Sequence, residues 1–461
     1  MARARNEALV ALLREAGWSQ PQVAAAVARV AAESGVRELE AISRSHIAMW
    51  VQGTQPSGQA PHILRETLSR RLGRHLTLAD LGLEGKATGQ TDSGSDWSVD
   101  PLTVLAELGS DDLDMHRRKL LATAAYSAAG LALPTASWWA AAPAAAAKRP
   151  AVCPRPVTQA DIDDVRGLTT FYSARDQQRG GASGRSALAG HLRDEAVPLL
   201  GSRFRTEQLR RETYSAVAEM TYLTGWMAFD ASEHRTAQRY LTLAARIAAE
   251  AGDGPLGGHI LRALAHQAVD LGHPRRALAL ADASMSRDRY GQASPREKAL
   301  LAIVHARALA ADGDRPATLA AISRAERDLA RADNNEAPGR VGFFQEASLA
   351  HETACALRDL GQPLDAEIHF KRSVATRRQQ YARTHSVTLG YLGAVQVQQG
   401  HVDEACATWS RALDAMTGVQ SGRARDVIVR MRSDLSPVRG RGGRHIAELD
   451  RRARETLRAI S

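Results

Sequence analysis

The sequence predicts an all-α protein, and three observations support that fold class. Aromatic residues make up only 5% of the 461 residues while Ala, Leu and Arg dominate, a composition that favours helices over sheets. Apolar residues recur at helical spacing, as in Ala237, Tyr240, Leu241, Ala244 and Ile247. A short turn signature also returns five times between residues 232 and 405. We therefore expect a chain of helices whose second half is built from repeated units.

The turn signature pairs a small or polar residue with an Ala five positions later. The five pairs are Ser232/Ala237, Gly272/Ala277, Asp312/Ala317, Gly361/Ala366 and Gly400/Ala405. Successive alanines lie 40, 40, 49 and 39 residues apart, a period typical of stacked helix hairpins. Pro274, Pro316 and Pro363 stand where the second helix of a hairpin would begin. The pattern predicts a tetratricopeptide-like α-solenoid with units longer than the usual ~34 residues, and an Ala-rich helical domain without repeats is the alternative.

The composition also limits the compartment and the class of partner. A hydrophobic content of 44% is enough for sizeable cores and excludes wholesale disorder. Three cysteines, Cys153, Cys355 and Cys406, lack the spacing of a disulfide framework, which predicts a reducing, cytoplasmic location. A net charge of +9 permits a nucleic-acid partner without requiring one.

Residues 1–85 are predicted to form a small helical domain. Gly17 breaks a first helix, and Ser19 is placed to cap a second helix that carries Pro21 in its first turn. These residues hold ten Arg against eight Asp or Glu, so non-specific affinity for phosphates should be modest. The alternative is a capping or dimerisation module that binds no DNA.

A later helix of this segment carries the candidate DNA-reading face. It begins after Ser43 and ends at Gly53, and its apolar residues Ile47 and Trp50 share one side. The remaining face carries small and polar residues: Arg44, Ser45, Ala48, Met49 and Gln52. A short helix that is buried on one side and polar on the other is what reading the major groove requires.

The middle of the chain changes character twice. Residues 86–113 include a Thr, Gly, Ser and Asp-rich stretch at 88–96, which predicts a flexible linker and independent movement of the two halves. Within residues 114–157 lies an uncharged run at 120–147, preceded by Arg117-Arg118-Lys119 in the manner of a twin-arginine export signal, but far from the N-terminus. A membrane span is a second interpretation, which Pro134, Pro143 and the scarcity of Leu weigh against. We favour an Ala-rich helix at about 114–132 packed on the repeats, followed by a Pro-rich turn.

Motifs that suggest catalysis or a cofactor are rejected on their context. Residues 252–257 match a G-x-G-x-x-G string but follow a helix and contain a Pro, so they are predicted to form a turn between hairpins. His351 and Cys355 are one helical turn apart, but no further metal ligand accompanies them. Basic clusters at 377–378 and 439–454 are interpreted as solvated helix faces. We predict no enzyme activity, no metal and no cofactor.

Several segments carry a resemblance to a known family. They are Gly225-Trp226-Met227-Ala228-Phe229-Asp230, Ala237-Gln238-Arg239-Tyr240, Ala251-Gly252-Asp253, the turns at 272–274 and 361–363, and Ser421-Gly422-Arg423-Ala424. With the Ser19-Gln20 start and the Ser43-x-x-x-Ile47 helix, the chain resembles actinobacterial transcriptional regulators that join a repressor-like, XRE-type helix-turn-helix domain to a tetratricopeptide-like domain. About a dozen extra residues, at 29–40, separate the two helices of the motif, and Val51 stands where the family usually has Glu.

The resemblance implies a role and a set of contacts. Such regulators control development or secondary metabolism, and their repeat domain senses a peptide, a small molecule or a partner protein. Gln20 would contact phosphate or a base, while Arg44, Ser45 and Met49 would face base edges. The predicted DNA-binding set is therefore Gln20, Arg44, Ser45, Met49 and Gln52.

These observations combine into one prediction of organisation and function. The expected parts are a helix-turn-helix domain at 1–85, a flexible linker at 86–113, the uncharged helix and turn at 114–157, the repeats at 158–437 and a basic capping helix at 438–461. We predict a homodimeric regulator of double-stranded DNA whose repeats bind an effector in a groove. That groove is expected near Trp226, Ile260, His305 and Phe344. The alternatives are a protein-interaction adaptor without sequence-specific DNA binding and a membrane-tethered regulator.

Overall fold

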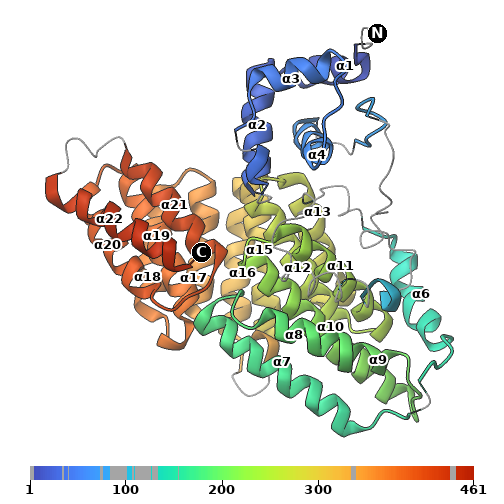
Figure 1. Cartoon of the computed structure of the whole chain (residues 1–461). Coiled ribbons are helices and arrows are strands. Elements are labelled where there is room, and N and C mark those ends of the chain that lie inside the picture. The colour runs from blue at the N-terminus through green and yellow to red at the C-terminus, as the bar shows by residue number, and fades with distance from the viewer. Residues whose placement is uncertain are drawn as a thin grey trace.

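The computed structural model consists of two helical parts, an N-terminal part and a larger helical array (Figure 1). It describes residues 5–33, 36–39, 41–72, 76–83, 101–105, 108, 126, 133–153, 155–333, 339–436 and 443–460. Within these ranges the chain is all-α, and the pairing of Pro156 with Arg203 is an isolated bridge outside any strand. The predicted fold class is confirmed at this level.

The N-terminal part is a small bundle with its own apolar core. Its elements are α1 (Glu7–Ala16), α2 (Gln20–Glu33), η1 (Arg37–Leu39), α3 (Arg44–Val51) and α4 (Ala60–Leu72). Asn6 joins the two ends of the bundle, because its side chain caps α1 at Leu9 N–H and donates to the Leu81 carbonyl at 2.8 Å. Leu9, Val23, Ile47 and Leu64 all lie in one core cluster and are almost fully buried.

The helical array is a succession of antiparallel helix pairs. The pairs are α10 (Glu207–Asp230) with α11 (His234–Ala251), α12 (Gly254–Asp270) with α13 (Pro274–Ser284), α15 (Pro295–Asp312) with α16 (Arg315–Ala330), α17 (Glu346–Asp359) with α18 (Pro363–Thr376), and α19 (Ala382–Gln398) with α20 (Val402–Ala415). Each expected turn signature marks the junction of one pair, and its Ala lies in the first turn of the second helix. All five predicted hairpins are therefore present.

The turn residues explain why the signature recurs. Ser232, Gly272, Gly361 and Gly400 have positive φ, the conformation that reverses the chain after a helix. In the third pair the positive φ belongs to Gly313, so the expectation of Asp312 is off by one position, because α15 extends through Asp312. The 49-residue step arises after α16, where the chain includes residues 331–345 and the short η4 (Gly339–Val341) before α17 begins.

Additional helices lie before, between and after the pairs. They are α7 (Gln159–Arg179), α8 (Arg185–His191), the π-helical segment η3 (Leu192–Ala196), α9 (Val197–Leu200), α14 (Arg287–Tyr290), η5 (Gln379–Tyr381), α21 (Gly422–Leu435) and α22 (Gly443–Ile460). In α22, Ile446, Leu449 and Ala453 are buried in the core that α19, α20 and α21 also form. This amphipathic helix therefore covers apolar surface at the C-terminal end of the array.

The two ends of the array meet. The Gln420 N–H donates to the Arg179 carbonyl at 2.6 Å, and the Ala182 N–H donates to the Gln420 carbonyl at 3.2 Å. A Cβ on Gly181 would lie 2.2 Å from the Met227 carbonyl oxygen, so only glycine allows this approach. The loop after α7 is thus clamped between α10 and the turn before α21.

The prediction of a Pro-rich turn near Pro134 and Pro143 is wrong in part. Residues Ala136–Ala147 form a helix, α6, capped by Thr135, and Pro143 lies inside it. Ala has the highest helix propensity, and the array supports the helix because α6 packs on α11. The helix expected at 114–132 lies outside the described residues except for the buried Tyr126.

The two parts of the protein touch. Glu66 on α4 is only 2% exposed, and its Oε1 lies 3.5 Å from Nε2 of His273, the residue that precedes α13. The Tyr126 ring stacks on the same imidazole with 5.4 Å between centroids. Burial, with Arg70 and Arg276 nearby, lowers the pKa of His273 to about 3, so the imidazole is neutral at pH 7. The expected linker at 86–113 lies mostly outside the described residues, but the expectation of two independent halves does not match this contact.

In the regions where the structure describes the chain, no helix is both long and apolar enough to cross a bilayer. Residues 120–125 and 127–132 of the uncharged run are not among those regions.

Candidate functional site

The helix α3 is held in place by its cap and by its apolar side. The His46 Nδ1 lies 3.2 Å from the Ser43 N–H and accepts its hydrogen bond, the role that Glu or Gln usually has in a capping box. Ile47, Trp50 and Val51 are buried against the N-terminal core. The eight-residue helix is therefore oriented by packing, and one face remains for solvent.

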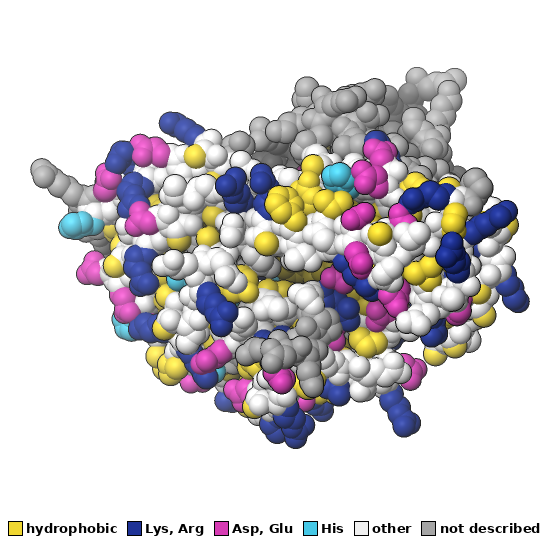
Figure 2. Space-filling view, turned by 90° about the horizontal axis from the view of Figure 1, so that it is seen from below, with side chains coloured by type: hydrophobic (Ala, Val, Ile, Leu, Met, Phe, Trp, Pro, Cys, Tyr) yellow, Lys and Arg dark blue, Asp and Glu magenta, His cyan; other side chains and the backbone are white. Residues whose placement is uncertain are grey.

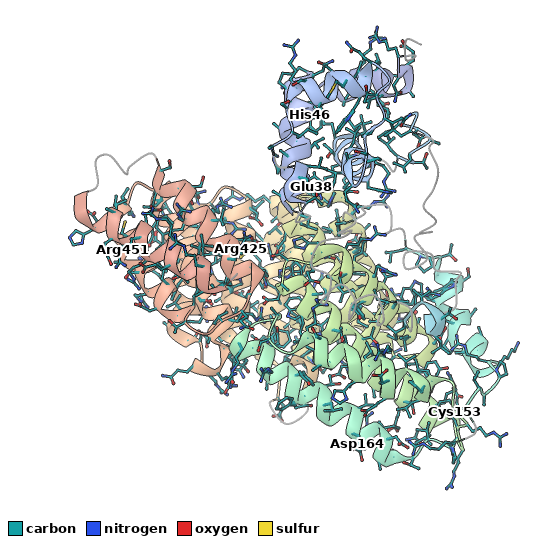
Figure 3. The ribbon with its side chains drawn as sticks, viewed as in Figure 1. Glu38, His46, Cys153, Asp164, Arg425 and Arg451 are labelled. Atoms are coloured by element: carbon teal, nitrogen blue, oxygen red, sulfur yellow. The ribbon has the colours of Figure 1, made fainter. Side chains whose placement is uncertain are left out.

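The exposed face of α3 carries the predicted residues. Arg44, Ser45 and Gln52 are exposed, and Met49 is 43% exposed although it is apolar. Figures 1 and 3 show α3 on the side of the N-terminal part that is remote from the array, with His46 labelled on it. Gln20 is half-buried at the first residue of α2, and α2 packs on α3. Four of the five predicted residues thus lie on two adjoining helices, and Gln52 directly follows α3.

The extra residues between the two helices are partly helical. The helix α2 continues to Glu33, and η1 follows at 37–39 before α3 begins at Arg44. This connection is longer than the tight turn of a repressor-like motif. The spacing between α2 and α3 along the chain therefore departs from that motif, although the two helices are in contact.

The predicted effector groove is only partly correct. Trp226 and Phe344 line one cavity of about 50 Å³ between α10, α12, α17, α19 and α21. Ile260 does not reach it, because its side chain is fully buried in the core that joins α12 to its neighbours. His305 is also not part of the lining, and its Nε2 lies 2.9 Å from Asp282 Oδ1. The sequence therefore predicts the two aromatic residues of this cavity, Trp226 and Phe344, but not its charged residues.

Four arginines line this cavity, and none of them is among the binding residues that the sequence predicts. They are Arg262, Arg377, Arg383 and Arg423. A signal was present, because Arg262 interrupts the apolar run from Ile260 to Leu264, and Arg423 lies in one of the segments that carry the family resemblance. A charged residue among apolar ones on a helix is unusual when it faces a core. We name this cavity the arginine pocket.

His351 and Cys355 face one another but do not resemble a metal centre. Their Nε2 and Sγ atoms are 3.8 Å apart, and the His351 Nδ1 lies 2.8 Å from the Thr388 hydroxyl. Burial raises the pKa of the Cys355 thiol to about 12, so sulfur stays protonated rather than becoming a thiolate ligand. The pair fits a neutral hydrogen-bonded contact in the core.

A second group with metal-ligand chemistry is already neutralised. The ligand atoms of Glu367, His401 and Glu404 lie within 4.8 Å of one another. The Lys371 ammonium lies between the carboxylates, 2.8 Å from Glu367 and 3.0 Å from Glu404. A cation would have to displace this lysine, so the group is a salt-bridge cluster.

The basic clusters have different structural roles. Arg451 on α22 (Figure 3) pairs with Glu448 and Glu455 of its own helix, while Arg452 pairs with Asp414. Figure 2 shows cationic side chains spread among acidic ones on one face of the molecule, rather than gathered into a patch. Residues 437–442 lie outside the described ranges. The described part of the C-terminal cluster thus lies on solvated helix faces, but that interpretation is wrong for Arg377, which is half-buried and lines the cavity.

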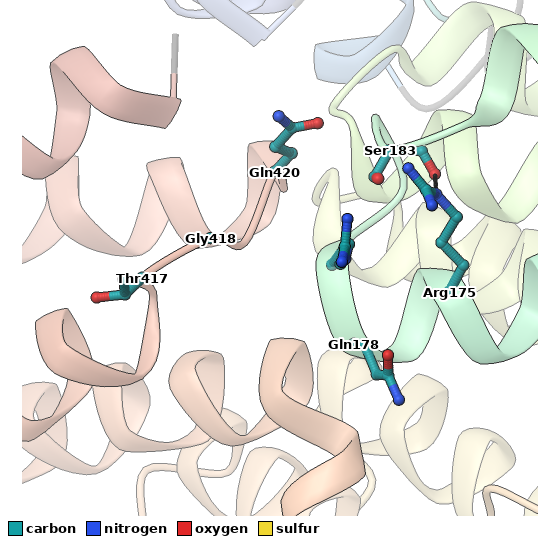
Figure 4. A pocket seen from close by; sticks show the side chains of 7 residues that line it. Arg175, Gln178, Ser183, Thr417, Gly418 and Gln420 are labelled. Carbon is teal, nitrogen blue, oxygen red and sulfur yellow. Dashed lines mark hydrogen bonds between the residues drawn. The ribbon is translucent and has the colours of Figure 1, made fainter.

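A larger groove lies where the two ends of the array meet. It has a volume of about 470 Å³ and is lined by residues at the end of α7 and the turn before α21 (Figure 4). Arg175 donates to the Ser183 carbonyl at 3.2 Å, and Gln178 and Arg179 are exposed. This groove is a surface feature of the junction.

Comparison with known proteins adds one match. Residues 9–84 match the model of the SP15 N-terminal domain. The matched residues extend from α1 through α4 and the turn that follows, so the N-terminal part coincides with a recognised domain. No curated protein shows a significant match to the chain.

Proposed function

We propose that the protein is a DNA-binding transcriptional regulator whose helices α2 and α3 act as a helix-turn-helix pair. The observation that carries this proposal is the division of α3 into two faces. Ile47 and Trp50 hold the helix on the core, while Arg44, Ser45 and Met49 are exposed to solvent. A helix fits the major groove when one side is anchored and the other is polar.

The side chains suit base-edge contacts. Arg44 is exposed, and no carboxylate among the described residues lies within 4 Å of it, so its guanidinium is available for the O6 and N7 atoms of guanine. A bidentate contact of this type contributes about 1–3 kcal/mol of discrimination against a wrong base. Ser45 can donate or accept, and the Met49 side chain can contact a thymine methyl group. Gln20 begins α2, where backbone N–H groups suit a phosphate.

The array would supply the regulatory half. Its paired helices and positive-φ turns support a tetratricopeptide-like domain that binds a peptide, small molecule or protein in the cytoplasm. An eight-residue reading helix covers only a few base pairs, which favours a homodimer on two half-sites. An effector could then act by changing the distance between the two α3 helices, for which half-sites about 34–36 Å apart are expected.

The test is selection of random duplex DNA on the full-length protein. We expect an enriched, partly palindromic motif with the wild type and with the charge-matched control Arg205→Ala, whose side chain is exposed on the array. The variant Arg44→Ala/Ser45→Ala should lose the motif while its circular dichroism stays unchanged. Equal enrichment with the double variant would show that α3 does not read the sequence.

A protein-interaction adaptor is the second candidate. Two observations favour it: the long connection between α2 and α3, and the small excess of Arg over acidic residues in the first 85 positions. An adaptor would enrich no DNA motif with any of the three proteins, and would instead retain a partner protein on the array.

A further inference from the structure

The arginine pocket concentrates positive charge inside the array. Of its four arginines, Arg262 and Arg383 are each only 2% exposed, and Arg423 is 13% exposed at its side chain. Burial of a guanidinium is tolerated when a carboxylate pairs with it. The distribution of carboxylates around these arginines therefore decides what the pocket can do.

Two of the arginines have carboxylate neighbours. Arg383 lies 3.1 Å from Asp176 and 2.9 Å from Asp230. Arg423 Nη2 lies 3.8 Å from Asp270, but that carboxylate is shared with Arg307 at 3.0 Å. Arg383 is thus fully paired and Arg423 only weakly.

Arg262 has only neutral partners. It donates to the Tyr222 hydroxyl at 2.6 Å and to His259 Nε2 at 3.2 Å, and its guanidinium lies 5.2 Å from the centre of the Trp226 ring. Within the part of the chain that the structure describes, no carboxylate lies within 4 Å of it, and its buried Nε has no hydrogen-bond partner. This side chain is a buried cation with an unused donor.

Arg377, which follows α18, also has only neutral hydrogen-bond partners in the described part of the chain. Its Nη2 donates to the Ala347 carbonyl at 2.8 Å and to the Ser373 hydroxyl at 2.9 Å. Among the described side chains it has no carboxylate within 4 Å, and its Nε also has no acceptor. Burial lowers the pKa of Arg377 to about 10, which leaves it cationic at pH 7.

The remaining titratable groups of the lining do not cancel this charge. Glu352 is the carboxylate of the lining, and it is already paired with Arg307 at 3.2 Å. Although burial opposes its ionisation, His266 and Arg307 hold the pKa of Glu352 at about 2. Burial lowers the pKa of His266 and lowers that of His351 to about 3, so both are neutral. Positive charges therefore outnumber negative charges in the lining of the arginine pocket.

We propose that the arginine pocket binds the carboxylate or phosphate group of a small-molecule ligand, with Arg262 and Arg377 as its charged donors. A planar guanidinium matches both anions through paired N–H groups. On a measure in which one water takes about 10–15 Å³, the volume of about 50 Å³ holds about three to five waters, which is room for the anionic group and a small attached body. Trp226 and Phe344 also line the pocket, so an aromatic body attached to the anion would meet aromatic side chains.

A bound anion would join distant helices. Arg262 belongs to α12, whereas Arg377 follows α18 and Arg423 belongs to α21. Binding therefore cross-links early and late pairs of the array and stabilises the folded state by mass action. This binding is independent of any contact with DNA.

The test measures anion binding to the full-length protein without DNA. Inorganic phosphate and benzoate are titrated at constant ionic strength, with sodium chloride as the baseline, and followed by calorimetry and thermal unfolding. We expect saturable binding and a higher Tm with at least one probe, both for wild type and for the exposed control Arg205→Gln. Phosphate alone would indicate a phosphate ligand, and benzoate alone an aromatic carboxylate.

Two variants decide the role of the arginines. Arg377→Gln, at a half-buried position, should weaken binding at least tenfold. Arg262→Met should abolish binding and, without anion, leave the Tm equal to or above that of the wild type, because a buried unpaired charge is removed. The proposal is overturned if neither probe binds saturably, or if Arg377→Gln binds as well as wild type. A lower Tm of Arg262→Met without anion would assign Arg262 a purely structural role.

Discussion

The Arg383 Nη1 lies 2.9 Å from the Asp230 Oδ1, although the two residues are 153 positions apart in the chain. Arg383 belongs to α19 and Asp230 ends α10, so the contact joins the last helix pair of the array to the first. The other oxygen of Asp230 accepts the Gly181 N–H at 2.8 Å, and Arg383 also meets Asp176 of α7. One buried cation therefore holds three helices together.

Removal of this cation should destabilise the protein strongly. Arg383→Met leaves Asp176 and Asp230 buried without their partner, which costs about 3–5 kcal/mol of unfolding free energy. Urea unfolding measures the loss, and the exposed neighbour Arg378→Met should change the free energy by less than about 0.5 kcal/mol. Adding Asp176→Asn and Asp230→Asn to Arg383→Met should recover part of the stability. No recovery would mean that lost packing, rather than unpaired charge, causes the effect.

The junction at Gly181 should be sensitive to a single methyl group. In Gly181→Ala the new Cβ would lie 2.2 Å from the Met227 carbonyl oxygen, and the backbone must shift to relieve the clash. We expect a loss of about 1–3 kcal/mol in chemical denaturation. Gly167→Ala is the matched control, because Gly167 lies within α7 with open space around its Cβ position. That control should be more stable than wild type by about 0.5–1 kcal/mol, and similar losses in both variants would contradict the close approach.

Acid should destabilise the array through its buried histidines. The pKa of His351 falls from its usual value to about 3 on folding because the ring is buried, with Glu352 opposing the shift and Arg377, Arg423 and Arg307 assisting it. Below pH 6.5 the unfolded chain binds a proton at His351 that the folded protein does not bind. The stability that the neutral ring contributes is therefore fully present above pH 6.5 and decreases toward pH 3. One such histidine makes the protein less stable by about 2 kcal/mol at pH 5 than at pH 7.

The variant His351→Asn isolates this contribution. It removes the titrating ring but keeps a polar atom near Nδ1, where the Thr388 hydroxyl lies. The difference in unfolding free energy between pH 7 and pH 5 should shrink by about 2 kcal/mol relative to wild type. An unchanged difference would show that His351 is already protonated or exposed in the folded protein.

Charge reversal at Glu66 should separate the two parts of the protein. Glu66→Arg places a cation beside Arg70, which lies 3.1 Å from Glu66, and beside the buried His273. We expect a larger radius of gyration in small-angle X-ray scattering, because α4 can no longer lie against the start of α13. Glu7→Arg, an exposed position at the start of α1, should leave the radius unchanged. Equal radii for both variants would mean that the contact does not hold the parts together.

The hairpins were predictable because their signals are local. Gly272 and Ala277 lie in one turn and one helix start, and the constraints that select them act within a few residues. The same holds for α3, where the Ser43 cap and the Ile47 and Trp50 spacing were sufficient. The errors at Asp312 and Pro143 also have a common source, since in each case a helix extended further than its local breaker suggested.

The sequence by itself determined the all-helical class, the five hairpin turns and the two faces of α3, because helix periodicity and capping are short-range effects. Only the tertiary structure decided which charged residues are buried together. Arg383 meets partners 153 and 207 positions away, and Arg262 and Arg377 line one pocket from different helix pairs. The free energy of a buried charge depends on the neighbours that folding supplies, and spacing along the chain does not encode those neighbours.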